Sequence, residues 1–161
     1  MRLPLTGGCQ CGAVRYEIIA EPMTVYACHC RDCQRQTGAA FALSMIVARD
    51  ALRVTAGTPV AWLRPGAHTA SGTPTHCMMC GACGSRLFNL PTRAPQLAIV
   101  RPGTLDDTGW LVPVGHIWTD SAQPWFKIPA DTVNYKRQPP DNGPLIAAWQ
   151  SRRDHGATAR S

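Results

Sequence analysis

The sequence predicts a mainly β domain of short antiparallel strands, with metal-binding cysteines and a short C-terminal helix or tail. Apolar residues recur at the strand period of two more often than at the helical period of 3.6. The 161 residues include 14 glycines and 14 prolines, which indicates tight turns and irregular loops between strands. All eight cysteines fall in three short clusters, which we expect at strand ends and turns.

Strands are predicted first where apolar and polar residues alternate. Val14, Tyr16 and Ile18 form one such series, and a second series of apolar residues extends over 41–47. Turn signals such as Arg64-Pro-Gly66 separate further segments of strand character. These segments are 52–55, 60–63, 86–90 and 97–101.

The C-terminal part differs in character from the rest of the chain. Apolar spacing predicts a helix over 145–153, and Pro139 with Pro140 marks a boundary before it. We therefore expect a zinc-binding β domain over 1–138. A basic extension over 139–161 should be partly helical or disordered.

Composition narrows the class of protein. No apolar run is long enough to cross a bilayer, and no signal-like stretch precedes the first cysteines, so we expect a cytoplasmic protein with reduced thiols. The net charge of +6 is scattered along the chain, with its densest part in the tail. This makes nucleic acid an improbable partner and fits an acidic small substrate better. The sequence leaves the oligomeric state open.

The spacing of the cysteines points to metal. Cysteines two residues apart lie too close for an unstrained disulfide, yet both can bind one cation. Cys80-Gly-Ala-Cys83-Gly84 has the form of a zinc knuckle, in which glycine lets backbone N–H groups turn toward sulfur. The three clusters are Cys9 and Cys11; Cys28, Cys30 and Cys33; and Cys77, Cys80 and Cys83.

Counting ligands suggests one closed and one open site. Structural zinc takes four protein ligands, whereas catalytic zinc takes three and leaves one position free. Cys28, Cys30 and Cys33 can supply three thiolates from six residues. Cys9, Cys11 and two cysteines of the third cluster would then make a structural site. Spacing alone does not forbid other pairings, and a four-cysteine iron site is also possible.

Four ordered motifs over about residues 5–137 resemble the glutathione-dependent formaldehyde-activating enzyme family, also called the CENP-V/GFA domain. The motifs are Gly7-Gly-Cys-Gln-Cys-Gly12, Cys28-His-Cys-Arg-Asp-Cys33, Cys80-Gly-Ala-Cys-Gly-Ser85, and His116-Ile-Trp-Thr-Asp with Pro124-Trp125-Phe126. The resemblance implies a β-tent fold with two zinc ions, one structural and one catalytic. It implies Cys9, Cys11, Cys80 and Cys83 as structural ligands, and Cys28, Cys30 and Cys33 as the open, catalytic set. Cys77 lies outside the family pattern, and we interpret it as a buried spare thiol.

The resemblance also implies a carbon-sulfur lyase of the S-(hydroxymethyl)glutathione synthase type, which joins glutathione to formaldehyde or a related small aldehyde. A site of three thiolates is a weak Lewis acid and suits a thiol ligand better than water. Arg35, just after the second cluster, is a candidate contact for a glutathione carboxylate.

The alternative is a non-catalytic, zinc-stabilised binding module for a protein or nucleic-acid partner. A fourth protein ligand at the second site, such as His29, His76 or Cys77, would favour it. Strand alternation predicts that His29 points away from its neighbouring cysteines and is a bystander. His116 belongs either to a packed aromatic strand or to a pocket wall.

Overall fold

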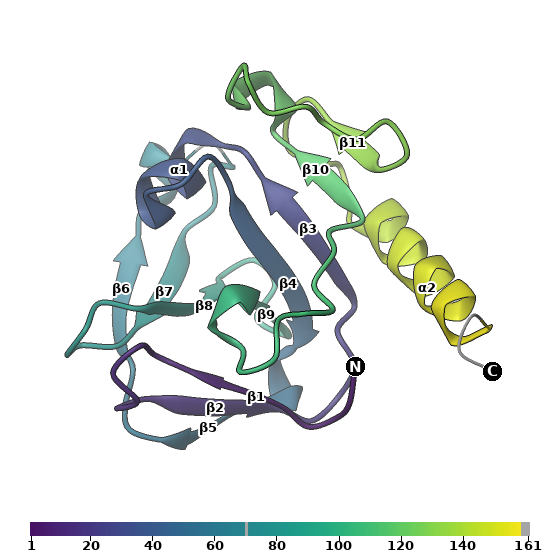
Figure 1. The fold of residues 1–161 in the computed structure, drawn as a ribbon. Coiled ribbons are helices and arrows are strands. Elements are labelled where there is room, and N and C mark those ends of the chain that lie inside the picture. Colours follow the sequence, from purple (N-terminus) through teal and green to yellow (C-terminus); the bar gives the residue numbers. More distant parts are fainter. Residues whose placement is uncertain (70, 159–161) are drawn as a thin grey trace. The chain divides into compact units, whose positions relative to one another are not determined.

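The computed structural model describes residues 1–69 and 71–158, and this part of the chain forms two compact units. The first unit comprises Met1–Pro22 and Met45–Leu111, and the second comprises Met23–Ser44 and Val112–Ser161. Strands are the most numerous regular elements in the described part of the chain, so the predicted mainly β class is confirmed (Figure 1). No helix of the described part is long and apolar enough to cross a membrane.

The first unit contains a three-stranded antiparallel sheet in the order β1-β2-β5. Its strands are β1 (Leu5–Gly8), β2 (Arg15–Ile18) and β5 (Leu52–Ala56). In β2, Tyr16 and Ile18 are buried while Arg15 and Glu17 are partly exposed, which is the alternation that the sequence predicted. The series from Val14 therefore places one face of this sheet in the core.

The first unit also contains consecutive antiparallel strands in the order β9-β8-β7-β6. These are β6 (Val60–Arg64), β7 (Thr75–Met79), β8 (Arg86–Pro91) and β9 (Leu97–Val100). β9 pairs with the second half of β4 (Ala42–Ala48), from Met45 onward. Short 3-10 helices η1 (Arg49–Ala51), η2 (Gly66–His68) and η3 (Pro102–Thr104) connect the strands.

Tyr16 joins the two sheets of the first unit. Its ring meets the ring of Phe88 edge-on at 6.4 Å, and its hydroxyl lies 2.8 Å from the Thr104 hydroxyl. Burial raises the pKa of Tyr16 to about 12. A Cβ on Gly7 would meet the Tyr16 ring at 2.6 Å and the Thr104 carbonyl at 2.6 Å, so glycine is required for this close approach.

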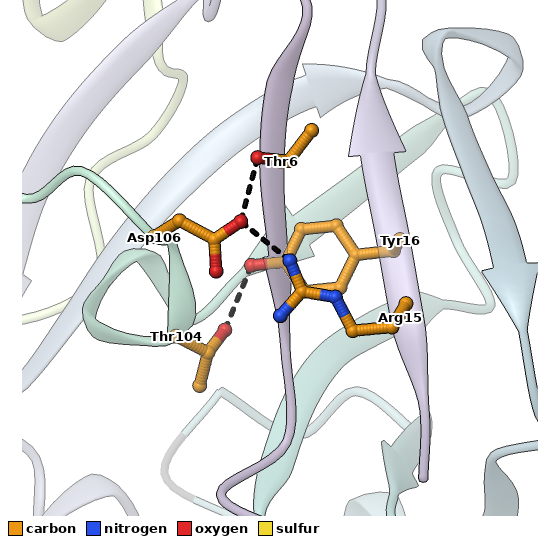
Figure 2. Close-up of polar contacts among 5 residues, drawn as sticks. All are labelled: Thr6, Arg15, Tyr16, Thr104 and Asp106. Atoms are coloured by element: carbon orange, nitrogen blue, oxygen red, sulfur yellow. Dashed lines mark hydrogen bonds and ion pairs between the residues drawn. The ribbon is translucent and has the colours of Figure 1, made fainter. Parts of the chain in front are cut away.

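A polar cluster beside Tyr16 fixes the segment after η3 against β1 and β2 (Figure 2). Asp106 accepts a hydrogen bond of 2.6 Å from the Thr6 hydroxyl and pairs with the Arg15 guanidinium. The Asp106 N–H donates to the Thr6 carbonyl at 2.9 Å. The Arg15 and Thr6 contacts lower the pKa of the Asp106 carboxyl below its usual value.

The second unit is built on β3 (Thr24–Cys28), β10 (Gly115–Ile117) and β11 (Val133–Tyr135), with β10 in the centre. α1 (Arg31–Thr37) follows β3, and η4 (Thr119–Ser121) follows β10. β10 runs parallel to both of its neighbours, which departs from the all-antiparallel pairing expected from the sequence. Parallel neighbours cannot be joined by a tight hairpin, and long connections separate these strands in the chain.

The C-terminal helix α2 (Gly143–Thr158) is longer than the predicted 145–153 and packs on β3 and β11. Leu145 is fully buried, and its carbonyl accepts a hydrogen bond of 2.9 Å from the Thr24 hydroxyl. Gly115 makes room for it, because a Cβ there would lie 2.3 Å from Leu145 Cδ2. The first turns of the helix are therefore part of the packed second unit.

All six predicted strand segments are present, whereas β1, β3, β7, β10 and β11 lie outside them. β3 and β10 are buried at every position, so they show no alternation of apolar and polar residues. The short helix α1 was also not expected, since the cysteines there suggested only a turn.

Shortening Leu145 should destabilise the protein. Leu145→Ala leaves a cavity beside Gly115 and should lower the free energy of unfolding by about 2–5 kcal/mol. Urea unfolding followed by circular dichroism measures this. The control is Gln150→Ala at an exposed position of α2, which should change stability by less than about 0.5 kcal/mol. Equal stabilities of the two variants would show that α2 is not docked through Leu145.

The Asp106 cluster should contribute stability that is lost in acid. Because the folded-state pKa of Asp106 is lowered, the unfolded chain takes up its proton first as the pH falls. Asp106→Asn should lower the free energy of unfolding near neutral pH, but by less than about 1 kcal/mol, since the pair with Arg15 is largely exposed. The difference from wild type should shrink once the pH falls below about 4.

Unfolding curves at several pH values test the Asp106 prediction. Asp131→Asn, at an exposed carboxyl outside the cluster, is the matched control and should show no such pH-dependent difference. A difference between Asp106→Asn and wild type that persists unchanged into acid would contradict the assignment.

Candidate metal centres

Two groups of cysteine sulfurs in the described residues could each hold a metal ion. Within each group the Sγ atoms all lie within 4.8 Å of one another. We call Cys9, Cys11, Cys80 and Cys83 the four-cysteine site, and Cys28, Cys30 and Cys33 the three-cysteine site. Each site lies within one compact unit, the first and the second respectively. The structure thus brings together the same two sets that the motifs implied.

The four-cysteine site forms where two turns of the first unit meet. Cys9 follows β1 and Cys11 lies in the turn to β2, whereas Cys80 follows β7 and Cys83 lies in the turn to β8. The Sγ atoms of Cys9 and Cys11 are 3.5 Å apart, and those of Cys11 and Cys80 are 3.8 Å apart. A disulfide would need about 2.05 Å, and all four cysteines are free.

Backbone N–H groups and glycines shape both turns of the four-cysteine site. The Val14 N–H donates to Cys9 Sγ at 3.2 Å, and this bond lowers the pKa of Cys9. Gly84 has a φ of 73°, in the left-handed region, and its N–H donates to the Cys80 carbonyl. The Ser85 hydroxyl, 3.2 Å from Cys83 Sγ, lowers the pKa of Cys83 to about 5. These contacts therefore favour the thiolate form of Cys9 and Cys83, which is the form that binds metal, whereas the pKa of Cys11 is raised to about 12 because the Cys9 and Cys83 thiols outweigh a hydrogen bond from the Ala13 backbone.

The three-cysteine site forms where β3 passes into α1. Cys28 is the last residue of β3, Cys30 caps the N-terminus of α1, and Cys33 lies in its first turn. Cys30 Sγ accepts a hydrogen bond of 3.4 Å from the Cys33 N–H. The neighbouring thiols lower the pKa of Cys30 to about 3, and the same contacts raise that of Cys28. All three cysteines are buried, so a cation here would relieve a charge that water cannot reach.

The two donor sets differ in number. Four thiolates match a closed tetrahedral site, and three thiolates match a site with one position left for another ligand. Among the described residues, no His, Cys, Asp or Glu completes the three-cysteine group as a fourth donor. The chemistry of both sets suits a thiophilic divalent ion such as zinc.

His29 lies between two cysteines of the three-cysteine site, yet its ring hydrogen-bonds elsewhere. His29 Nε2 is 2.9 Å from His116 Nδ1, and the two rings stack at 5.2 Å. Phe41 and Phe126 pack on His29 at 5.2 and 5.1 Å. Burial, and next His116, lowers the pKa of His29 to about 4, so its ring is neutral at physiological pH. The late motif thus supplies a buried partner for His29, which the sequence did not reveal.

The peptide of His29 is held as firmly as its ring. Its N–H donates to the Ile117 carbonyl at 2.9 Å. Its carbonyl accepts hydrogen bonds from Gln34 Nε2 at 2.8 Å and from the Ser121 hydroxyl at 3.0 Å. Sequence reasoning missed Gln34 and Ser121, because no spacing rule brings residue 121 next to residue 29.

The other candidate residues lie outside both metal groups. Arg35 is exposed in the last turn of α1. His76 is exposed on β7, and Cys77 beside it is fully buried, with its thiol 3.8 Å from the Thr75 carbonyl. Asp120 of the late motif pairs with Arg137 at 3.7 Å. None of these four residues belongs to the sulfur clusters that could hold metal.

Comparison with known proteins supports the resemblance seen in the motifs. The profile of the family described as glutathione-dependent formaldehyde-activating enzyme matches residues 4–121. Among curated proteins, none matches this sequence significantly.

A crystal structure of a Rhodobacter sphaeroides protein is similar to this chain, with a TM-score of 0.51 and 21% sequence identity. The alignment covers 68% of this chain and 98% of that one, and at this identity it supports the fold alone. Because the family profile covers most of the sequence and includes every cysteine of both sites, the chain belongs to the glutathione-dependent formaldehyde-activating enzyme family.

Proposed function

We propose that this protein is a zinc-dependent carbon-sulfur lyase of the S-(hydroxymethyl)glutathione synthase type. The observation that carries the proposal is the three-cysteine site, in which three buried thiols converge without a fourth protein donor in the described residues. Membership of the family supports the substrate pair of glutathione and formaldehyde, or a related small aldehyde. The reduced, clustered cysteines fit a cytoplasmic protein.

The two sites would have different roles. Cys9, Cys11, Cys80 and Cys83 would hold a structural zinc ion, because four thiolates leave no position for substrate. Cys28, Cys30 and Cys33 would hold the second ion, which when bound offers its free position to the sulfur of glutathione and keeps that sulfur deprotonated.

The chain's own residues prepare this site for a thiol. Cys28, Cys30 and Cys33 are buried, so competing water is limited and the thiolate charge is strongly felt. The glutathione sulfur would form a C–S bond with the aldehyde carbon while the C=O π pair moves to oxygen. That oxygen then takes a proton from solvent, and no electron is gained or lost overall. Arg35 on α1 is our candidate for a contact to a glutathione carboxylate.

The binding-module alternative has less support. A fourth protein ligand at the three-cysteine site would favour it, and none of the three candidate residues joins that group. His29 bonds to His116, and neither His76 nor Cys77 belongs to a described metal group.

Replacing one cysteine at each site should separate the two proposed roles. Cys30→Ser should leave a folded protein with one zinc ion. Cys80→Ser should lose cooperative unfolding, because structural zinc contributes folding free energy. Native mass spectrometry with thiol titration measures the metal count, and wild type should show two zinc ions and one free thiol.

The matched control for these variants is Cys77→Ala, which removes a buried thiol outside both sites and should keep both ions. A wild-type protein with one zinc ion and four titratable thiols would contradict the allocation.

Glutathione should bind wild-type protein through its thiol. Isothermal calorimetry should show a heat that changes with the ionisation enthalpy of the buffer, because the thiol releases its proton on binding. S-methylglutathione keeps both carboxylates but lacks the thiol, and it should bind at least about tenfold more weakly. Cys30→Ser should bind neither ligand tightly. Absence of binding at millimolar glutathione, with both zinc ions present, would overturn the glutathione assignment.

A further inference from the structure

We infer that Gln34 is a positioning residue for the three-cysteine site, which it orients through the carbonyl of His29. Gln34 directly follows Cys33 in α1, and its side chain is half-buried. It touches no sulfur in the described contacts. It acts instead on the one residue that lies between Cys28 and Cys30. The inference rests on the proposed function to the extent that the three-cysteine site binds metal.

Every hydrogen-bonding position of the Gln34 amide is used. Nε2 donates to the His29 carbonyl at 2.8 Å and to the Ser121 carbonyl at 2.8 Å. Oε1 accepts from Gln123 Nε2 at 3.0 Å and from Arg31 Nη1 at 3.2 Å. A side-chain amide has two N–H donors and two acceptor lone pairs, so this one is fully satisfied.

The partners also fix which way the amide faces. Two carbonyl oxygens lie on its nitrogen side and two N–H donors on its oxygen side. A flipped amide would set oxygen against the carbonyls of His29 and Ser121. Glutamine is therefore required at this position, because glutamate would present only acceptors there.

Gln34 connects three short segments that meet at the three-cysteine site. The segment 28–30 carries two of the cysteines, α1 carries the third, and η4 supplies Ser121. The Ser121 hydroxyl donates to the same His29 carbonyl at 3.0 Å. The His29 carbonyl, between Cys28 and Cys30, thus accepts hydrogen bonds from both Gln34 and Ser121. These bonds fix the backbone there and with it the orientation of the two cysteine side chains.

Outer hydrogen bonds of this kind tune metal ligands in general, and removing one commonly weakens metal binding by about 10- to 100-fold. Gln34→Glu keeps the size of the side chain but sets oxygen against the His29 and Ser121 carbonyls. It should weaken zinc binding at the three-cysteine site by about 10-fold or more. Gln34→Met removes the hydrogen bonds without adding charge, and should weaken zinc binding at this site to a smaller extent.

The measurements are zinc competition with a colorimetric chelator and cadmium NMR of the full chain loaded with two cadmium ions. Wild type should give two cadmium resonances, since four-sulfur and three-sulfur sites differ in shift. In both Gln34 variants only the three-sulfur resonance should move or broaden. Gln150→Glu, which adds the same charge at an exposed position of α2 in the same unit, is the control and should match wild type.

Two results with the Gln34 variants would overturn the inference. In one, both Gln34 variants keep the wild-type chemical shift of the three-sulfur cadmium resonance and a zinc affinity within about threefold of wild type. The other is equal loss of both resonances, which would make Gln34 a general folding residue. These experiments contain no glutathione. If wild type failed to bind glutathione in calorimetry, the proposed function would therefore be overturned while the inference about Gln34 would still stand. A wild-type protein that takes up no second metal would remove both.

Discussion

The crowding of seven cysteine sulfurs into two groups is the constraint on which the rest of the structure depends. Within each group every Sγ lies within 4.8 Å of the others, and no disulfide relieves the crowding. The thiols of Cys28 and Cys33 hydrogen-bond to the Cys30 sulfur and lower the pKa of Cys30, and the contacts with Cys30 and Cys33 raise the pKa of Cys28. A divalent cation bound to either group would replace these protons, which would couple metal binding to the local fold.

A metal ion at the four-cysteine site would connect the two sheets of the first unit. Cys11 and Cys80 are separated by 69 positions in the sequence, and their sulfurs lie 3.8 Å apart. Closing so long a loop costs conformational entropy, which a bound ion can offset. The buried Tyr16 ring, set edge-on to Phe88, joins the same two sheets through packing. A metal ion bound at the four-cysteine site would therefore hold the same two sheets together at a second position.

The sequence predicts the mainly β class and the two cysteine sets because both are written in local patterns. Alternation reveals β2, and C-x-C or C-x-x-C spacing needs no knowledge of the fold. The contact of His29 with His116 depends instead on β10 lying parallel to β3, which places residues 87 positions apart side by side. β3 is buried throughout and carries no periodic signal. The hydrogen bonds of Gln34 could not be predicted either, because they join Gln34 to Ser121 and Gln123, which lie far away in the sequence.

The surroundings of His29 explain why its ring does not join the three-cysteine group in the described part of the chain. Besides the three cysteines, the segment 28–33 contains two residues of types that commonly bind metal, Asp32 and His29. Its Nε2 is taken by His116, its ring is packed by Phe41 and Phe126, and its carbonyl is held by Gln34. Turning Nε2 toward the sulfurs would break its hydrogen bond with His116, whereas Nδ1 is buried without a hydrogen-bond partner in the described structure. The second unit therefore keeps its own imidazole away from the cluster, which supports a free position for an external thiol.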